Sequence, residues 1–140
     1  MQTFTTHSET ETAAVGRELA ARLDAGSVVL LFGDLGAGKT AFVRGLAEGL
    51  GVDRDEVNSP TFTLIQEYRG GRVVLLHADL YRLNDAREVE ELGLDEQGED
   101  KVVAIEWAEK LERTPLAAIR VRITHAGDTE RLLTISHSDR

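Results

Sequence analysis

Residues 33–40 read Gly-Asp-Leu-Gly-Ala-Gly-Lys-Thr, and this stretch decides the fold. It matches the G-x-x-x-x-G-K-[ST] pattern of a phosphate-binding loop at every fixed position. The five apolar residues before it, 28–32, predict a short buried strand. Residues 41–50 after it carry apolar side chains at helical spacing. Strand, loop and helix in this order predict an α/β fold that binds a nucleoside triphosphate with Mg²⁺.

The residue types in the loop suit that chemistry. Glycine lacks a Cβ, so the backbone can turn tightly and bring its N–H groups close to phosphate oxygens at the start of the following helix. We expect Lys39 to reach the β- and γ-phosphates and Thr40 to give its hydroxyl to Mg²⁺. A glycine-rich turn with no ligand is the alternative, and the complete pattern argues against it.

Length and composition favour one domain over residues 1–140. The chain is 41% hydrophobic, which is typical of a globular protein, and no apolar run is long enough to span a bilayer. Its first residues are polar and do not resemble a signal peptide. Cysteine is absent, which excludes disulfides and thiolate metal sites and fits a cytoplasmic location.

The charge argues against direct binding to nucleic acid. The net charge is −9, and no Lys/Arg cluster could neutralise phosphates. Residues 85–100 contain eight acidic residues against one basic residue, a net charge of −7. The preferred interpretation of this segment is a solvated helix face and loop. The alternative is a docking patch for a basic partner.

The rest of the chain predicts a mixed sheet flanked by helices, a three-layer arrangement like that of P-loop NTPases. Ser8 and Glu11 have capping-box spacing and predict a helix that runs past Leu23 and ends near Gly26. Asn84 or Asp85 could cap a short helix that ends at Gly93. The expected strands are 64–68 and 72–77, joined in a hairpin, then 102–106, and finally 119–123 and 131–136, which form an antiparallel hairpin at a sheet edge.

Two carboxylates follow apolar strands and are candidates for holding Mg²⁺. Asp79 ends the run 73–79, and Glu106 ends the run 102–106. If the two strands are parallel, both acids reach the carboxyl edge of the sheet, where α/β folds bind ligands. Either acid alone could instead cap a turn or pair with an arginine. Thr61, in a hydroxyl-rich loop after the P-loop helix, lies where switch loops of nucleotide hydrolases sense the γ-phosphate, although an ordinary proline-containing turn is the simpler interpretation.

For the other polar residues, a structural role is preferred to a role in the site. His77 shares a strand face with Asp79 and could order that acid, but a satisfied structural histidine is preferred. Arg82 is expected in a structural ion pair. Asp34 is expected to turn its carboxylate away from the phosphates. The remaining histidines are scattered and predict no metal site.

Four motifs together resemble a known family. The P-loop is followed by Asn-Ser-Pro-Thr-Phe-Thr-Leu at 58–64, His-Ala-Asp-Leu-Tyr-Arg at 77–82 and Glu-Trp at 106–107. In this order and spacing they resemble TsaE, the small bacterial ATPase needed to make N6-threonylcarbamoyladenosine in tRNA. The resemblance covers nearly the whole chain, and the second and third motifs are far more specific than the P-loop. Many members carry a second threonine where Ala41 stands, which should matter little because Thr40 is kept.

The resemblance implies a set of site residues. The catalytic set would be Lys39, Asp79, Glu106 and Thr61, with Ser59 beside Thr61 on the switch-like loop. The Mg²⁺ set would be Thr40, Glu106 and Asp79. Trp107 would lie beside the nucleotide, and the start of the first helix would border the adenine. Arg131 would approach the nucleotide from the last hairpin. The full set expected to bind ATP is Glu9, Thr12, Asp34, Leu35, Gly36, Ala37, Gly38, Lys39, Thr40, Ala41, Trp107 and Arg131.

The resemblance also implies partners. In the family, the ATPase sustains repeated rounds of modification by a complex of TsaB and TsaD, which handle the transfer, so this chain would meet tRNA only indirectly. Three alternatives stay open from the residues alone. The first is a small-molecule kinase, although the acidic stretch 93–101, the longest irregular one expected, has no lid arginine. The second is a GTPase, although an Asn-Lys-x-Asp element is absent. The third is a module that binds ATP without hydrolysing it.

Overall fold

Parallel strands occupy the centre of the sheet. In a computed structural model, β2 (Val28–Phe32) pairs in parallel with β5 (Val102–Glu106) and with β6 (Ile119–His125), and β5 pairs in parallel with β4 (Leu75–Asp79). The structure describes residues 1–33, 38–52, 65–81, 83, 85–111 and 118–137. Both faces of β2 are covered, which explains its unbroken apolar sequence. The buried strand predicted over residues 28–32 is confirmed.

Antiparallel strands complete the sheet on both sides. β3 (Ile65–Tyr68) pairs with β4, β7 (Arg131–His137) pairs with β6, and β1 (Gln2–Thr6) pairs with β7. Within the described residues the seven strands run in the order β1-β7-β6-β2-β5-β4-β3. Both predicted hairpins are confirmed. The expectation that the C-terminal hairpin forms the edge is wrong, because β1, which was not predicted, covers it.

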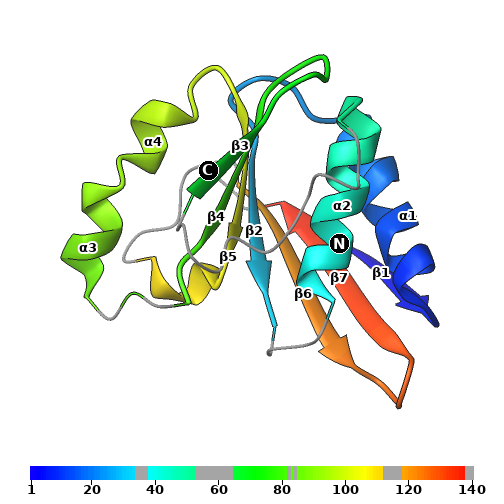
Figure 1. Ribbon diagram of the computed structural model, residues 1–140. Coiled ribbons are helices and arrows are strands. Elements are labelled where there is room, and N and C mark those ends of the chain that lie inside the picture. The colour runs from blue at the N-terminus through cyan, green and yellow to red at the C-terminus, as the bar shows by residue number, and fades with distance from the viewer. Residues whose placement is uncertain (34–37, 53–64, 82, 84, 112–117, 138–140) are drawn as a thin grey trace.

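Helices lie on both faces, which gives the predicted three layers (Figure 1). α1 (Glu9–Ala20) and α2 (Lys39–Leu50) cover one face. The short helices α3 (Ala86–Glu91) and α4 (Leu94–Gln97) lie over the other, and the 3-10 turn η2 (Ala108–Lys110) follows β5. The irregular stretch expected over 93–101 is therefore wrong in part, because it contains α4. No helix in the described ranges is long and apolar enough to cross a bilayer.

The predicted N-cap of α1 is confirmed, whereas the second bond of the capping box forms with the residue before the N-cap. Ser8 is the N-cap and its hydroxyl accepts from the backbone N–H of Glu11 at 3.1 Å. The Glu11 carboxylate accepts from the N–H of His7 at 2.6 Å. The helix ends at Ala20, earlier than expected, and the buried Leu23 lies in the turn that follows. Arg72 donates to the carbonyl oxygens of both Ala20 and Leu23, which satisfies acceptors that a helix end leaves open.

Other element boundaries differ by a few residues. β4 begins at Leu75, three residues later than expected, and α2 begins at Lys39, two residues earlier. α3 is capped by Asp85, whose carboxylate accepts from the N–H of Arg87, one of the two alternatives foreseen. Gly51 caps α2 in the left-handed conformation, at φ 93°. Such shifts of a few residues arise because caps and turns, which end an element, are weakly encoded by periodicity.

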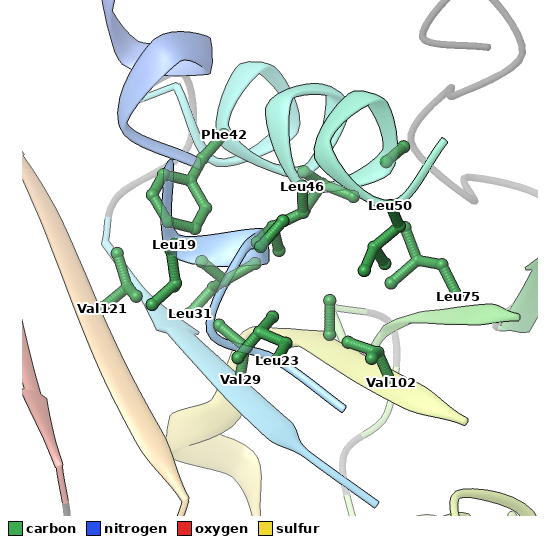
Figure 2. Packing of buried hydrophobic residues seen from close by; sticks show 14 of the residues in the cluster. Leu19, Leu23, Val29, Leu31, Phe42, Leu46, Leu50, Leu75, Val102 and Val121 are labelled. Carbon is green, nitrogen blue, oxygen red and sulfur yellow. The ribbon is translucent and has the colours of Figure 1, made fainter. Parts of the chain in front are cut away.

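The main hydrophobic core lies between the sheet and the pair α1 and α2. Figure 2 shows how Phe42 and Leu46 of α2 point toward the central strand with Leu31 and Val29, while Leu50 lies beside Leu75 of β4. Side chains of the opposite parity, such as Leu30 and Leu76, face α3 and α4 in a second cluster. The alternation of each strand thus assigns one set of side chains to each helical layer.

α1 and α2 approach each other closely because glycines remove the side chains between them. A Cβ on Gly45 would lie 1.8 Å from the carbonyl oxygen of Ala13, and one on Gly16 would lie 2.4 Å from that of Phe42. A Cβ on Gly49 would lie 2.5 Å from the Cβ of Ala20. The backbones could not reach these distances with any larger residue.

The acidic segment forms an exposed surface over α3, α4 and the turn after them. Glu88, Glu90 and Glu99 are among its exposed carboxylates, and Arg87 is exposed as well. A hydrogen bond from Lys101 lowers the pKa of Asp100, which keeps that carboxylate charged. These positions agree with the solvated-face interpretation of the segment.

We expect Gly45→Ala to destabilise the protein. The added methyl group meets backbone atoms that no rotamer change can move, and overpacking of this kind costs up to about 3 kcal/mol. Alanine regains about 1 kcal/mol of helix propensity. The net loss should be about 2 kcal/mol in the free energy of unfolding measured by urea titration. Gly127→Ala is the control, since its Cβ would lie no closer than 3.6 Å to Glu130. Equal stability of both variants would contradict the close approach.

Candidate functional site

Lys39 is buried at the start of α2 and joins the two ends of the phosphate-binding loop. It is 4% exposed, and its Nζ donates to the carbonyl oxygen of Gly33 at 2.6 Å. The same Nζ lies 4.0 Å from the centroid of the Trp107 ring, a cation–π contact. A buried ammonium needs such partners because burial removes its hydration. Gly33 and Gly38 flank the loop at φ 147° and 104°, backbone conformations that require glycine.

Asp79 and Glu106 lie side by side, as predicted. They are register partners at the ends of β4 and β5, and Glu106 also pairs with Leu31 of β2, the strand that leads into the loop. Both acids have the parity of Leu75 and Val102, which face the α1 and α2 layer. The sheet therefore presents two carboxylates on the side from which α2 starts.

Glu106 is held by a buried histidine. The Nε2 of His77 lies 2.5 Å from Oε2 of Glu106, and the two side chains are 0% and 4% exposed. The other ring nitrogen, Nδ1, is buried without a hydrogen-bond partner among the described residues. The prediction of a satisfied structural histidine thus holds for Nε2 and, among the described residues, not for Nδ1. The alternative, a histidine that orders an acid, was aimed at Asp79, whereas the contact is with Glu106.

Asp79 shapes the backbone that follows β4. Its Oδ1 accepts from the N–H of Tyr81 at 2.9 Å, an Asx-type turn. Lys110 ties this segment to the end of β5, because its Nζ donates to the carbonyl oxygens of Tyr81 at 2.5 Å and Leu83 at 2.7 Å. The segment that follows Asp79 is thus hydrogen-bonded to the segment that follows Glu106.

Trp107 adopts a strained conformation directly after Glu106. It is the one non-glycine residue with positive φ in the described part of the chain, at φ 59° and ψ 43°. Its ring lies 5.0 Å from that of Tyr81, and Lys39 lies over it. Strain of this kind persists only when surrounding contacts hold it, and it gathers at functional sites.

A cavity of about 280 Å³ lies beside the start of α2. It is bounded by the turn before α1, the first residues of α1 and α2, and the turn of the β6–β7 hairpin. Its lining comprises His7, Ser8, Glu9, Thr12, Gly38, Ala41, Asp128, Thr129 and Arg131. The structure therefore brings together five residues expected to bind the nucleotide, from both ends of the sequence: Glu9, Thr12, Gly38, Ala41 and Arg131.

Hydrogen bonds hold the walls of this cavity. The hydroxyls of Thr6 and Thr12 lie 2.8 Å apart in a buried pair that ties β1 to α1. Arg131 donates to the carbonyl oxygen of Glu130 at 2.9 Å, and His7 Nδ1 lies 3.9 Å from a carboxylate oxygen of the same Glu130. The pairing of Thr6 with Arg131 between β1 and β7 brings the hairpin turn beside the start of α1.

The oxygen donors present suit Mg²⁺. The described residues contain no group of three or more His, Cys, Asp or Glu side chains that could hold a metal. Mg²⁺ does not need one, because it is commonly bound by one or two carboxylates together with waters and substrate phosphates. Asp79, Glu106 and the hydroxyl of Thr40 would supply that kind of set. The neighbouring Lys39 suits phosphate rather than metal.

Several predicted residues lie outside the described ranges. Among the expected nucleotide-binding residues these are Asp34, Leu35, Gly36 and Ala37. The switch-like loop with Ser59 and Thr61 also lies outside them, as do Arg82 and Asn84.

Sequence reasoning missed five residues that line the cavity or pack at the site. His7, Asp128 and Thr129 were given no role at the site, and Tyr81 was quoted only as part of a motif. Ser8 was assigned only its cap. Asp128 and Thr129 gave no sequence signal, because no periodic pattern links a hairpin turn to the start of α1. The Tyr81 contact had a signal in the His-x-Asp-Leu-Tyr-Arg motif.

Comparison with known proteins places the chain in a family. The family model "Threonylcarbamoyl adenosine biosynthesis protein TsaE" matches residues 6–133. The tRNA threonylcarbamoyladenosine biosynthesis protein TsaE of Bacillus subtilis is 48% identical over 128 residues, 90% of this chain and 79% of that protein. The protein of the same name from Rickettsia bellii is 37% identical over 132 residues, 94% of this chain and 92% of that one.

A solved structure agrees with the fold. The crystal structure of Bacillus subtilis YdiB superposes with a TM-score of 0.77 at 38% identity, over 97% of this chain and 84% of that chain. The match of the family model and the two relatives span both the P-loop and the strands that carry Asp79 and Glu106. The chain therefore belongs to the TsaE family of threonylcarbamoyladenosine biosynthesis proteins.

Proposed function

We propose that this protein is an ATPase that acts in the biosynthesis of threonylcarbamoyladenosine in tRNA. One observation carries the proposal: the buried Lys39 stands at the start of α2, on the side of the sheet where Asp79 and Glu106 lie in register. A cation for phosphate and two carboxylates for a metal are the protein groups that phosphoryl transfer needs. The cavity beside Gly38 and Ala41 offers room for the base.

Each residue has an assigned role in this proposal. The adenine would enter the cavity between Thr12 and Arg131, and the backbone N–H groups at the start of α2 would face the phosphates. Lys39 would exchange its bond to Gly33 for the β- and γ-phosphates. Glu106 and the Thr40 hydroxyl would hold Mg²⁺. Bound there, the ion would neutralise charge that develops on the phosphates. Asp79 would orient the attacking water or a water on the metal.

The proposed partners are TsaB and TsaD. We propose that ATP hydrolysis drives turnover of a complex of these two proteins in the cytoplasm, and that they hold the tRNA. A net charge of −9 supports the indirect contact, because RNA binding draws much of its affinity from basic side chains. The acidic surface of α3 and α4 offers such a partner a charged face for docking.

Filling the cavity should block the nucleotide. Ala41→Leu adds a larger apolar side chain to the wall at a residue that is 5% exposed, and we expect ATP affinity to fall about tenfold or more by calorimetry. Each tenfold loss corresponds to about 1.4 kcal/mol. Ala21→Leu makes the same change at the exposed C-cap of α1, and this variant should bind ATP normally. Wild-type affinity in Ala41→Leu would argue that the base binds elsewhere, and stronger binding of GTP than of ATP would argue for a GTPase.

Lys39→Ala should abolish repeated rounds of tRNA modification. In a reconstituted assay with TsaB, TsaD and tRNA, we expect product to stop near one equivalent, because the phosphates lose their cation. Arg22→Ala is the control, since it removes an exposed cation from the turn after α1, away from both the site and the acidic surface. Circular dichroism should show that both variants fold. If Lys39→Ala supported as many turnovers as wild type, the proposed role would be wrong.

The isolated protein should hydrolyse ATP slowly, and the partner complex should accelerate it. Many such sites are completed by an arginine from a partner, a contribution worth roughly 10³–10⁵ in rate. We therefore expect a stimulation of at least about tenfold on addition of TsaB and TsaD, measured as phosphate release. The Glu106→Gln variant should show no such stimulation of ATP hydrolysis. Rapid turnover without partners, or phosphorylation of a metabolite, would favour a free-standing enzyme or a kinase.

A further inference from the structure

The buried contact between His77 and Glu106 has no role in the chemistry assigned above. His77 Nε2 lies 2.5 Å from Glu106 Oε2, and His77 is wholly buried. The two residues come from neighbouring parallel strands, since His77 pairs with Ala104 and Asp79 pairs with Glu106. His77 therefore lies one pleat below the acids, on the same face of the sheet.

The contacts of the His77 imidazole ring indicate which of its nitrogens carries the proton. Nδ1 is buried and has no hydrogen-bond partner in the part of the chain that the structure describes. Tyr68, whose ring centroid lies 6.2 Å from that of His77, donates its hydroxyl to Gln66 instead. An ionised carboxylate can only accept, so the hydrogen of the contact with Glu106 has to come from the ring. The proton therefore belongs on Nε2, and the ring donates to the Glu106 carboxylate.

This arrangement fixes the carboxylate from behind. One oxygen of Glu106 accepts from His77, so the side chain has one preferred rotamer and its other oxygen is left for another ligand. Residues that hydrogen-bond a metal-ligating carboxylate orient it, and their loss typically costs 10–100-fold in metal affinity.

We propose that His77 is a positioning residue that orients Glu106 for Mg²⁺, a role that rests on the proposed function. Loss of the Nε2 donor would let the carboxylate rotate while the phosphate contacts of Lys39 stay intact. The expected defect is therefore in the Mg²⁺ dependence of ATP binding and not in ATP binding itself.

Trp107 offers a readout besides activity. It is the only tryptophan of the chain, and its ring contacts Lys39, so its fluorescence should respond to the nucleotide. ATP is titrated into the full-length protein in EDTA, and MgCl₂ is then titrated at fixed ATP. We expect His77→Leu to raise the MgCl₂ concentration for half-saturation about tenfold, with ATP affinity in EDTA within about twofold of wild type. His77→Gln, which can place an amide N–H where Nε2 stood, should restore most of the loss.

Controls separate positioning from general destabilisation and from failure of the proposed function. Leu76→Ala removes a fully buried side chain from the same strand but on the opposite face, so it should lower the melting temperature without moving the Mg²⁺ response. Glu106→Gln should shift that response at least as much as His77→Leu. If Glu106→Gln shifts it and His77→Leu does not, His77 has no positioning role.

Two further outcomes are decisive. If neither variant shifts the Mg²⁺ response, the assignment of Glu106 to the metal fails, and the His77 proposal falls with it. If His77→Leu does not fold, His77→Gln is compared with His77→Asn, whose shorter amide should not reach Glu106. A defect in the asparagine variant alone supports the proposal, whereas equal behaviour of the two overturns it.

Discussion

The close approach of α1 to α2 is the constraint on which the rest of the structure depends. With glycine at positions 16, 45 and 49, the two helix backbones meet with nothing larger than hydrogen between them at the crossing. This contact sets how far the start of α1 lies from the start of α2. The cavity is lined from both helix starts, by Glu9 and Thr12 on one side and Gly38 and Ala41 on the other. A wider crossing would enlarge the core and separate the cavity walls at the same time.

Buried polar groups gather around the candidate site. Among the described residues, the buried polar or charged side chains are Thr6, Thr12, Lys39, His77 and Glu106. Thr6 and Thr12 bond each other beside the cavity, and the other three lie around the ends of the central strands. Replacing such groups by apolar side chains is often neutral or stabilising, so their burial is poorly explained by stability alone. Their common location instead agrees with a site whose groups are held in place before a ligand arrives.

Prediction from the sequence succeeded where a pattern is local or where two strands share a direction. The P-loop flanks, the N-cap at Ser8 and the strand ends at Asp79 and Glu106 follow from spacing. The two strands that carry these acids are parallel, which was the condition for both acids to reach the same edge of the sheet. Prediction failed for features that depend on pairing between strands far apart in the sequence. β1 is a short polar strand at the edge, and nothing in Gln2–Thr6 reveals that β7 will accept it. The His77 contact with Glu106 was missed for the same reason, since it depends on the register between two strands.

The distribution of charge explains how an acidic protein could hold a polyanion. The acidic segment lies with α3 and α4 on one face of the sheet, whereas Lys39 and the start of α2 lie on the other (Figure 1). Solvent-exposed charges are screened beyond a Debye length, about 8 Å at physiological ionic strength, so surface carboxylates across the sheet act weakly on the phosphate side. Lys39 and the backbone dipoles of α2 act at contact distance. The local field at the loop is therefore set by a few buried groups rather than by the net charge. Under the proposed function, the same separation would leave the acidic face for a partner while the opposite face holds the nucleotide.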